Sequence, residues 1–362
     1  MDDTNDGMSR FLVLAVCFAL LAVPSALAGK VGDPGNSPRT KATAPTTSWA
    51  QAPIRDVVSH GLMAKTVAAF RAADTLTQGE LASLVAGLTK QPAATTANPS
   101  APVTVAQLDA RLVRSLQLSE AATAFADGAV AAGLVVPSRF GSESVARLLG
   151  LRTDHPLKHD NLELLPGDPV TRAETAYSVS KILHFRGWEP QYALDAAATF
   201  SLPQLGAWQK RVLNTAVRFI GYPYVWGGTS ELPEAPFGVS APGGFDCSGF
   251  VWRVYKLQAY PGGTTLAPTI KGRTTYQMSG EVPKSKRIAF AKLAPGDLLF
   301  FGPNGPRSSS ASIGHTGIYL GAGWMIHSSG QGVALSPLTG WYKQQFAWGR
   351  RPLAEAGLTT SP

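Results

Sequence analysis

Apolar residues recur at helical spacing in three segments of the first half of the chain, and each segment begins with the same polar pattern. A threonine is followed three residues later by Glu or Gln, at Thr77, Thr104 and Thr171. In such a capping box the threonine hydroxyl accepts from the backbone N–H three residues on, and the Glu or Gln side chain accepts from the threonine N–H. The pattern predicts three related helical units that pack on one another.

The pattern changes at about residue 200. Apolar residues at helical spacing predict one more helix over residues 205–220. Beyond it, short apolar runs rich in aromatic and β-branched residues and bounded mostly by Gly or Pro predict strands. These strands are Asp297–Phe301, Ile313–Leu320, Trp324–Ser328, Val333–Leu335 and Phe346–Arg351. A helix-rich half followed by successive strands predicts an α+β protein with a mostly antiparallel sheet.

The first 52 residues lack the pattern of a folded domain. The apolar run Phe11–Val23 is followed by Ala26 and Ala28, which suit cleavage by a signal peptidase, so residues 1–28 are predicted to be a secretory signal. The run is shorter than the roughly 20 residues of a membrane span, so no stable span is expected after cleavage. Residues 29–52 are rich in Pro, Thr, Ser and Ala and are predicted to be a flexible spacer.

Composition narrows the classes of function. Of the 362 residues, 44% are hydrophobic and 15% are charged, which is a globular composition. The formal net charge of +8 suits attraction to anionic polymers, and it equally serves solubility. No nucleic-acid-binding motif accompanies this charge, so nucleic acid is not an expected partner.

Cleavage of the signal would leave Cys247 as the one cysteine of a secreted chain. Such a thiol is either buried filler or a reactive group. Two glycines and Asp246 precede it, and apolar residues at helical spacing follow from Ser248. Cys247 is thus expected at a helix N-terminus, where free N–H groups and the helix dipole favour the nucleophilic thiolate and lower the thiol pKa.

A reactive thiol needs a base, and the C-terminal half holds two histidines, His315 and His327. The segment Gly321–Gly323 between them predicts a tight turn, and a hairpin centred on residue 321 pairs 315 with 327. We expect both imidazoles on one face of the sheet, so that one accepts the thiol proton and the other orients it. A register slip of one residue would separate them. No metal-ligand spacing is present, so neither a metal nor another cofactor is expected.

Five blocks of the C-terminal half, taken in order, resemble the motifs of a known family. They are Tyr222–Gly228, Phe245–Val251, Leu293–Phe301, Gly314–Gly321 and Met325–His327. Over about residues 208–352 the chain is similar to the NlpC family of papain-like cell-wall cysteine peptidases. The resemblance implies a papain-like domain over residues 201–355, in which a helix carrying the cysteine packs on an antiparallel sheet carrying the histidine pair.

The resemblance also implies the chemistry of this domain. The expected triad is Cys247, His315 and His327, which would cleave peptidoglycan stem peptides next to D-glutamate through a thioester acyl-enzyme. Tyr224 is expected beside the nucleophile, where its hydroxyl could stabilise the oxyanion. The protein is then expected to be extracellular or associated with the cell wall.

Asp246 and Ser248 are expected to line the substrate pocket, as the equivalent residues do in some members of the family. Asp246 could pair there with a peptide amine, or it could simply cap the helix that follows. One departure concerns the interval from Cys247 to His315, which is longer than the family leads us to expect. The surplus falls in residues 261–286 and 302–312. Such loops could cover the cleft and narrow the choice of substrate.

Residues 53–200 form the predicted helical region. Its third unit, Leu164–Glu174, resembles the S-layer homology repeat of wall-attached proteins, and the other two units match more loosely. The resemblance implies a module that binds wall polymers. Because any amphipathic helix can begin with a capping box, a purely structural role for these units stays open.

Two other functions stay open on the sequence alone. The protein could be a non-catalytic cell-wall-binding protein, although the nucleophile and base are both present. It could also be a peptidyl or acyl transferase with the same triad, because water and an amine acceptor differ only in their access to the pocket.

Overall fold

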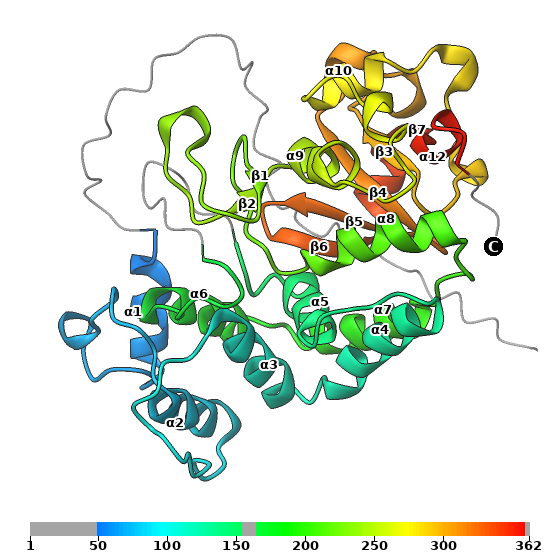
Figure 1. The fold of residues 1–362 in the computed structure, drawn as a ribbon. Coiled ribbons are helices and arrows are strands. Elements are labelled where there is room, and N and C mark those ends of the chain that lie inside the picture. The colour runs from blue at the N-terminus through cyan, green and yellow to red at the C-terminus, as the bar shows by residue number, and fades with distance from the viewer. Residues whose placement is uncertain (1–48, 154–163, 359–362) are drawn as a thin grey trace, which may run out of the picture. The chain divides into compact units, whose positions relative to one another are not determined.

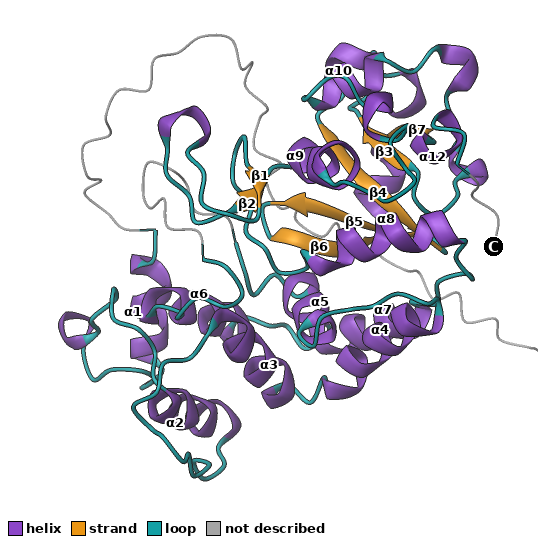
Figure 2. Cartoon of the chain, viewed as in Figure 1, coloured by secondary structure: helices purple, strands orange, loops and turns teal. Residues whose placement is uncertain are grey.

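The first part of the described chain is helical, as the sequence predicts (Figure 1, Figure 2). The structure, a computed structural model, describes residues 49–153 and 164–358. The predicted signal peptide and residues 29–48 of the predicted spacer lie outside the described residues. The helices of this part are α1 (Gln51–Ser59), α2 (Gln78–Thr89), α3 (Val105–Ser115), α4 (Ser119–Ala131), α5 (Phe140–Leu148), α6 (Arg172–Leu183) and α7 (Glu189–Thr199), with a 3₁₀ turn at Val67–Ala69.

The predicted capping threonines begin α2, α3 and α6. Complete capping boxes form at Thr77 and Thr104. At the third site the hydroxyl of Thr171 accepts from the backbone N–H of Glu174 at 3.1 Å, as predicted. The carboxylate of Glu174 instead pairs with Arg152 at 3.0 Å. The three helix starts are therefore confirmed, and the third lacks the reciprocal bond because its acid joins a buried ion pair.

A ring of backbone hydrogen bonds joins the three helix starts. The N–H of Leu76 donates to Val170 O (2.9 Å), that of Val170 to Val103 O (2.8 Å) and that of Val103 to Leu76 O (2.9 Å). Each of these residues directly precedes a capping threonine, and all are fully buried. Because each buried N–H and C=O group finds a partner, the ring stabilises the junction. The expectation that the three units pack on one another is confirmed.

The second part of the described chain contains an antiparallel sheet of the order β6-β5-β4-β3-β7. Its strands, all of them predicted, are β3 (Leu298–Phe301), β4 (His315–Gly321), β5 (Trp324–Ser329), β6 (Gly332–Pro337) and β7 (Phe346–Arg350). A small hairpin pairs β1 (Thr229–Ser230) with β2 (Gly244–Phe245). The α+β fold class is confirmed.

The helices of this part cover the sheet and its edges (Figure 1). They are α8 (Ala207–Arg218), α9 (Cys247–Trp252), which continues as a π-helical turn over Arg253–Leu257, α10 (Thr275–Gly280), α11 (Gly340–Gln345) and α12 (Pro352–Glu355). Short 3₁₀ turns lie at Pro236–Gly238, Ala267–Thr269, Lys284–Lys286, Phe290–Lys292, Gly305–Arg307 and Ser310–Ser312. Each helix in residues 49–153 and 164–358 is too short or too polar to span a membrane.

The helical part and the sheet share a hydrophobic core. The rings of Phe125 on α4 and Phe200 after α7 lie 5.5 and 5.2 Å from the ring of Trp324 on β5. Helix α5 contacts β6, and the guanidinium of Arg147 on α5 donates to the carbonyl of Gly221. The helical region is therefore packed against the sheet, and the predicted domain boundary near residue 200 stays a prediction.

The predicted register of the β4–β5 hairpin is wrong by two residues. Its turn lies at Ala322 and Gly323, whose φ angles of 48° and 80° are both positive, and a bulge precedes Gly321. The strands pair Ile318 with Ile326, so His327 lies opposite Gly317 rather than opposite residue 315. Because the error is an even number of residues, His315 and His327 still share one face of the sheet.

Candidate active site

Cys247 is the first residue of α9, the position that the sequence predicts. The preceding Gly244 has φ of 144°, and a Cβ there would lie 2.7 Å from the carbonyl oxygen of Pro223. A Cβ at Gly249 would lie 1.8 Å from the carbonyl oxygen of Gly228. These glycines let the first turn of α9 lie directly against neighbouring backbone, which fixes the place of the thiol.

The thiol lies beside the first residues of β4. Cys247 is half-buried, and the backbone N–H groups of Thr316 and Ser248 lie close enough to its sulfur to lower the pKa of the thiol. Since Thr316 directly follows His315, the fold brings the predicted nucleophile and the predicted base together. Helix α9 also contacts β5, the strand that carries His327.

The two histidines are joined by a hydrogen bond of 2.8 Å between Nε2 of His315 and Nδ1 of His327. His327 is fully buried, and its Nε2 lies 2.9 Å from the hydroxyl oxygen of Ser336 on β6. Ser336 also lies close to Tyr342 on α11, since it lowers the pKa of the Tyr342 hydroxyl, which burial raises to about 12. Within the described residues Nδ1 of His315 makes no hydrogen bond, so it is the ring nitrogen of His315 that can accept a proton.

Tyr224 lies beside the strand that leads to the nucleophile. Its backbone forms a parallel bridge with Phe245, and the next N–H, that of Val225, donates to Phe245 O at 3.2 Å. The side chain is half-buried. Its side chain lines a pocket with Arg152 and Glu174 of the helical part. The expected place of this side chain beside the nucleophile, and its role towards the oxyanion, stay predictions.

Comparison with known proteins bears on this arrangement. Residues 221–351, which contain the cysteine and both histidines, match the NlpC/P60 family. Residues 221–351 form an NlpC/P60 domain. Within it, the expected papain-like arrangement is confirmed, since α9 with the cysteine packs on β4 and β5, which carry the two histidines.

Curated relatives match this NlpC/P60 domain over part of their length. The gamma-D-glutamyl-L-lysine dipeptidyl-peptidase of Bacillus cereus is 34% identical over 148 residues, which are 39% of this chain and 36% of that protein. The bifunctional muramidase/DL-endopeptidase of Bacillus subtilis is 36% identical over 132 residues, 36% of this chain and 32% of that protein. The chain thus spans about a third of the length of these relatives.

A solved structure is also similar to this chain. The NlpC/P60 family protein from Bacillus cereus is 30% identical to this chain. The match covers 42% of this chain and 42% of the Bacillus cereus chain, with a TM-score of 0.30.

The electrostatics of the NlpC/P60 domain favour neutral forms of the site residues. Burial, with a smaller contribution from the Asp246 carboxylate, raises the pKa of the Cys247 thiol to about 12. Burial lowers the pKa of His315 to about 4, and burial together with His315 lowers the pKa of His327 well below its usual value. The predicted lowering of the thiol pKa is therefore wrong for the free protein, because burial outweighs the N–H groups at the helix start.

Asp246 and Ser248 flank the nucleophile, as predicted, and they are bound by a residue that sequence reasoning missed. Both side chains contact the guanidinium of Arg273, from the surplus segment 261–286. No motif around Arg273 signals this contact in a single sequence. Ser336 and Tyr342 were missed for the same reason, since only the fold brings them to His327.

The site offers no evident place for a metal ion. Within residues 49–153 and 164–358, no group of three or more His, Cys, Asp or Glu side chains is arranged to hold one.

Proposed function

We propose that this protein is a secreted cysteine peptidase that hydrolyses stem-peptide amide bonds of peptidoglycan. The observation that carries the proposal is the position of Cys247 at the start of α9, beside the hydrogen-bonded pair of His315 and His327. Nε2 of His327 is in turn hydrogen-bonded to Ser336. The match of residues 221–351 to the NlpC/P60 family and the names of the curated relatives support the substrate class.

The mechanism begins with a neutral thiol and a neutral imidazole. Nδ1 of His315 takes the proton of Cys247 as the sulfur attacks the scissile carbonyl carbon. For Nδ1 of His315 to be unprotonated, the ring proton must be on Nε2, which donates a hydrogen bond to Nδ1 of His327. The ring proton of His327 is then on its Nε2, which donates a hydrogen bond to the hydroxyl oxygen of Ser336. Both imidazoles are thereby held in the tautomer that leaves the base free.

The oxyanion accepts hydrogen bonds from the backbone N–H of Cys247 and from the hydroxyl of Tyr224. One such donor typically lowers the barrier by about 2.7–4 kcal/mol. The His315 imidazolium then donates its proton to the leaving amine, and a thioester remains on Cys247. A water molecule, deprotonated by the same Nδ1, attacks the thioester and releases the acyl product with a free carboxylate.

We infer that the bond cleaved joins D-glutamate to the following diamino acid. Two relatives support this, because one is named a gamma-D-glutamyl-L-lysine dipeptidyl-peptidase and the other a DL-endopeptidase. The predicted signal over residues 1–28 supports a place outside the membrane, extracellular or in the cell wall.

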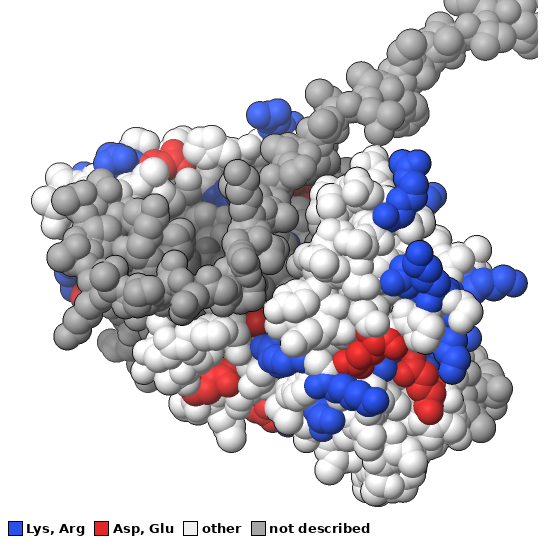
Figure 3. Space-filling view, turned by 90° about the horizontal axis from the view of Figure 1, so that it is seen from above, with Lys and Arg blue, Asp and Glu red and all other residues white. Residues whose placement is uncertain are grey.

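We also propose that anionic wall polymers attract the protein. The segments around α10 carry Lys271, Lys284, Lys286, Lys292 and Arg307, all exposed. Figure 3 shows basic side chains spread over one face, with a smaller acidic group among them. Such a surface concentrates the protein on a polyanion, and the attraction weakens with salt. Wall binding by residues 53–200 is a further part of this proposal, supported by the S-layer homology resemblance.

The test uses the chain without residues 1–28, incubated with purified peptidoglycan and followed by mass analysis of the soluble fragments. The native chain is expected to release peptides that begin with the diamino acid. Cys247→Ala is expected to release none, whereas Ser285→Ala, at an exposed position, is expected to match the native chain. Equal release by Cys247→Ala contradicts the proposal. Products that carry an added amine in place of water identify a transferase instead.

A further inference from the structure

Exposed aromatic side chains gather beside the catalytic histidines. Trp341 on α11 is 40% exposed, and Trp188 and Tyr192, at the start of α7 in the helical part, are 48% and 39% exposed. Large aromatic rings are mostly buried in proteins, so exposed rings that lie together mark a binding surface. We call these three residues, together with half-buried Tyr342, the aromatic surface.

Ring contacts make the aromatic surface continuous with the active site. The ring of Tyr342 lies 5.3 Å from that of His327 and 6.2 Å from that of His315. The ring of Trp341 lies 5.1 Å from that of Tyr342. It also stacks on the ring of Phe301, with 26° between the two planes, so the orientation of the indole is fixed.

The helical part supplies the other half of the aromatic surface. The rings of Trp188 and Tyr192 lie 6.0 Å apart. Tyr192 also lies close to Tyr342, since it raises the pKa of the Tyr342 hydroxyl. Helix α7 is held against the sheet because Phe200, which follows it, packs on Trp324 of β5 at 5.2 Å. The helical part therefore extends the active site beyond the NlpC/P60 domain.

The charges around the aromatic surface favour a neutral ligand. Helix α7 carries two acids, Glu189 and Asp195, and no basic residue, whereas α11 carries one base, Lys343. This balance gives little attraction to a polyanion or to an anionic membrane. The sugars of a glycan strand are neutral where their lactyl groups are joined to stem peptides, and their C–H groups pack well on the negative face of an aromatic ring.

The proposed cleavage position brings a sugar within reach of the aromatic surface. In peptidoglycan two residues, L-Ala and D-Glu, separate the glycan strand from the diamino acid. Fully extended, two residues span about 7 Å, and slightly more through the γ-linkage. The ring of Tyr342 lies at a similar distance, 6.2 Å, from the ring of the His315 base. A stem peptide bound at Cys247 therefore reaches this surface with its sugar.

We propose that the aromatic surface binds an N-acetylated amino sugar of the glycan strand, so that the preferred substrate is a stem peptide that carries its glycan. The inference rests on the proposed peptidase activity. Trp341 and the pair of Trp188 and Tyr192 each offer an exposed ring to a sugar. Because Trp and Tyr have only two side-chain torsions, and Trp341 is already fixed by its neighbours, binding costs little conformational entropy.

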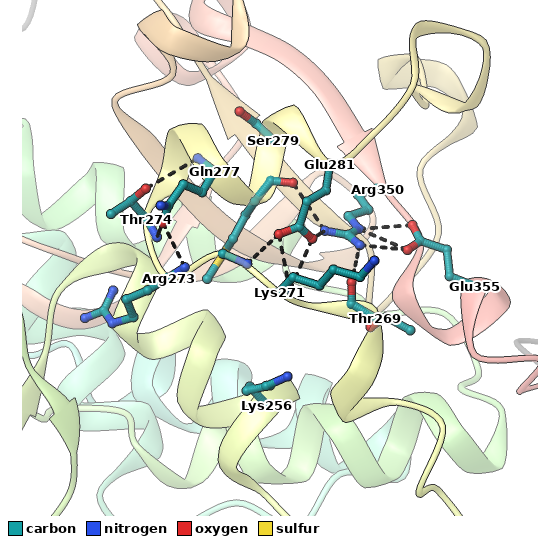
Figure 4. Close-up of polar contacts among 12 residues, drawn as sticks. Lys256, Thr269, Lys271, Arg273, Thr274, Gln277, Ser279, Glu281, Arg350 and Glu355 are labelled. Carbon is teal, nitrogen blue, oxygen red and sulfur yellow. Dashed lines mark hydrogen bonds and ion pairs between the residues drawn. The ribbon is translucent and has the colours of Figure 1, made fainter.

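A cavity of about 470 Å³ beside α10 suits a sugar less well. Its lining residues, none of them aromatic, are Thr265, Pro268, Thr269, Lys271, Glu281, Arg350 and Glu355. In Figure 4 the guanidinium of Arg350 lies between Glu281 and Glu355, which accept hydrogen bonds from it at 2.8 and 2.9 Å. The charged groups here are thus largely bound to one another, whereas the aromatic surface offers open ring faces.

The experiment compares two substrates with the same scissile bond. One is N-acetyl-L-Ala-γ-D-Glu-diaminopimelate, and in the other the disaccharide N-acetylglucosaminyl-N-acetylmuramic acid replaces the acetyl group. The native chain without residues 1–28 is expected to have a KM about tenfold lower for the disaccharide substrate. Trp341→Ala is expected to lose most of this difference by raising the KM for the disaccharide substrate, and Trp341→Phe to keep most of it. A merely structural role of Trp341 would impair both substrates alike.

A binding measurement separates this inference from the proposed function. The probe is a peptide-free tetrasaccharide of the glycan strand, titrated into the Cys247→Ala chain in a calorimeter. Binding is expected, and it should weaken about tenfold when Trp188→Ala or Trp341→Ala is added. Binding of the tetrasaccharide without turnover of either peptide substrate by the native chain contradicts the proposed function and supports the sugar site.

Two control variants leave the aromatic surface intact. Leu257→Ala, at an exposed apolar position, and Thr265→Ala, in the cavity beside α10, are expected to keep the native ratio of KM values. Equal KM values for the two substrates in the native chain, or loss of the ratio in Thr265→Ala, overturns the inference. An equal loss on both substrates in Trp341→Ala does the same. If circular dichroism shows that Trp341→Ala is not folded, Trp188→Ala decides by the same measurements.

Discussion

Nε2 of His315 lies 2.8 Å from Nδ1 of His327, although the two residues are not paired across their strands. His327 lies opposite Gly317, where an added Cβ would lie 3.0 Å from the Cβ of His327, so the glycine leaves room for His327 itself. The two rings meet edge to face, with an angle of 84° between their planes. A diagonal contact of this kind on one face of a sheet is within reach of ring-bearing side chains.

This contact predicts the effect of replacing His327. His327→Ala removes the acceptor for Nε2–H of His315, so the base can take the wrong tautomer, and kcat for stem-peptide hydrolysis should fall on the order of 10²–10⁴-fold with little change in KM. His327→Gln, whose side-chain oxygen can still accept, should retain more activity than His327→Ala. Steady-state kinetics of both variants, with circular dichroism to show that each is folded, gives the measurement.

Ser336 offers the matched comparison. Ser336→Ala removes the group that binds the outer nitrogen of His327, and it is expected to lower kcat less than His327→Ala, because the histidine pair itself is kept. If His327→Ala turned over substrate as fast as the native chain, the tautomer argument would be wrong.

The parts of this site that could be predicted from sequence are those set by local pattern. The glycines before Cys247 and the apolar spacing after it place the cysteine at a helix start, and short apolar runs between Gly and Pro locate the strands. The same-face position of His315 and His327 survived a wrong register, because the error was even. The register itself depends on a bulge before Gly321, which no short-range pattern signals.

The remaining features depend on contacts between segments distant in sequence. Arg273 reaches Asp246 only because Gln277 and Glu281 fix its loop. The thiol pKa was predicted from the helix end alone, whereas burial against β4 decides its direction. A single sequence shows neither the loop's course nor the depth at which a side chain lies.

The raised thiol pKa predicts how Cys247 reacts with iodoacetamide in the absence of substrate. Burial raises the pKa of the Cys247 thiol to about 12, so the thiol is neutral at pH values below this. Burial lowers the pKa of His315 to about 4, so this imidazole is uncharged at pH values above it. Alkylation at pH 7 should therefore be slower than for free cysteine, whose pKa is about 8.5, and should rise with pH through pH 9 without a plateau. Mass spectrometry of the intact chain over time measures the rate.

The control for this labelling is Cys247→Ser in the chain that lacks residues 1–28, which should take up no label. A plateau already reached below pH 8 would show a preformed thiolate and contradict the neutral site. The pH dependence of hydrolysis gives a second measurement. As the pH is lowered, kcat/KM should decline near pH 4, where His315 is protonated, rather than near pH 6.5.

Asp109 on α3 is a fully buried acid in the helical part. Neither of its carboxylate oxygens has a hydrogen-bond partner among the described residues. Burial first, and then Glu143, raise its pKa to about 7 from an ordinary value of 3.8. The folded chain therefore holds a proton here that the unfolded chain has lost between pH 3.8 and 7, and the free energy of unfolding should fall as the pH rises through this window.

Asp109→Asn removes this titration. At pH 8 the variant should exceed the native chain in free energy of unfolding by an amount on the order of a few kcal/mol, and the gap should narrow towards pH 4, where Asp109 is protonated. Urea unfolding at several pH values measures it, with Asp127→Asn, on the exposed side of α4, as the control. A gap that stays constant from pH 4 to pH 8 would mean that Asp109 keeps its charge on folding, and that Arg152 and Arg147, which lower its pKa, outweigh its burial.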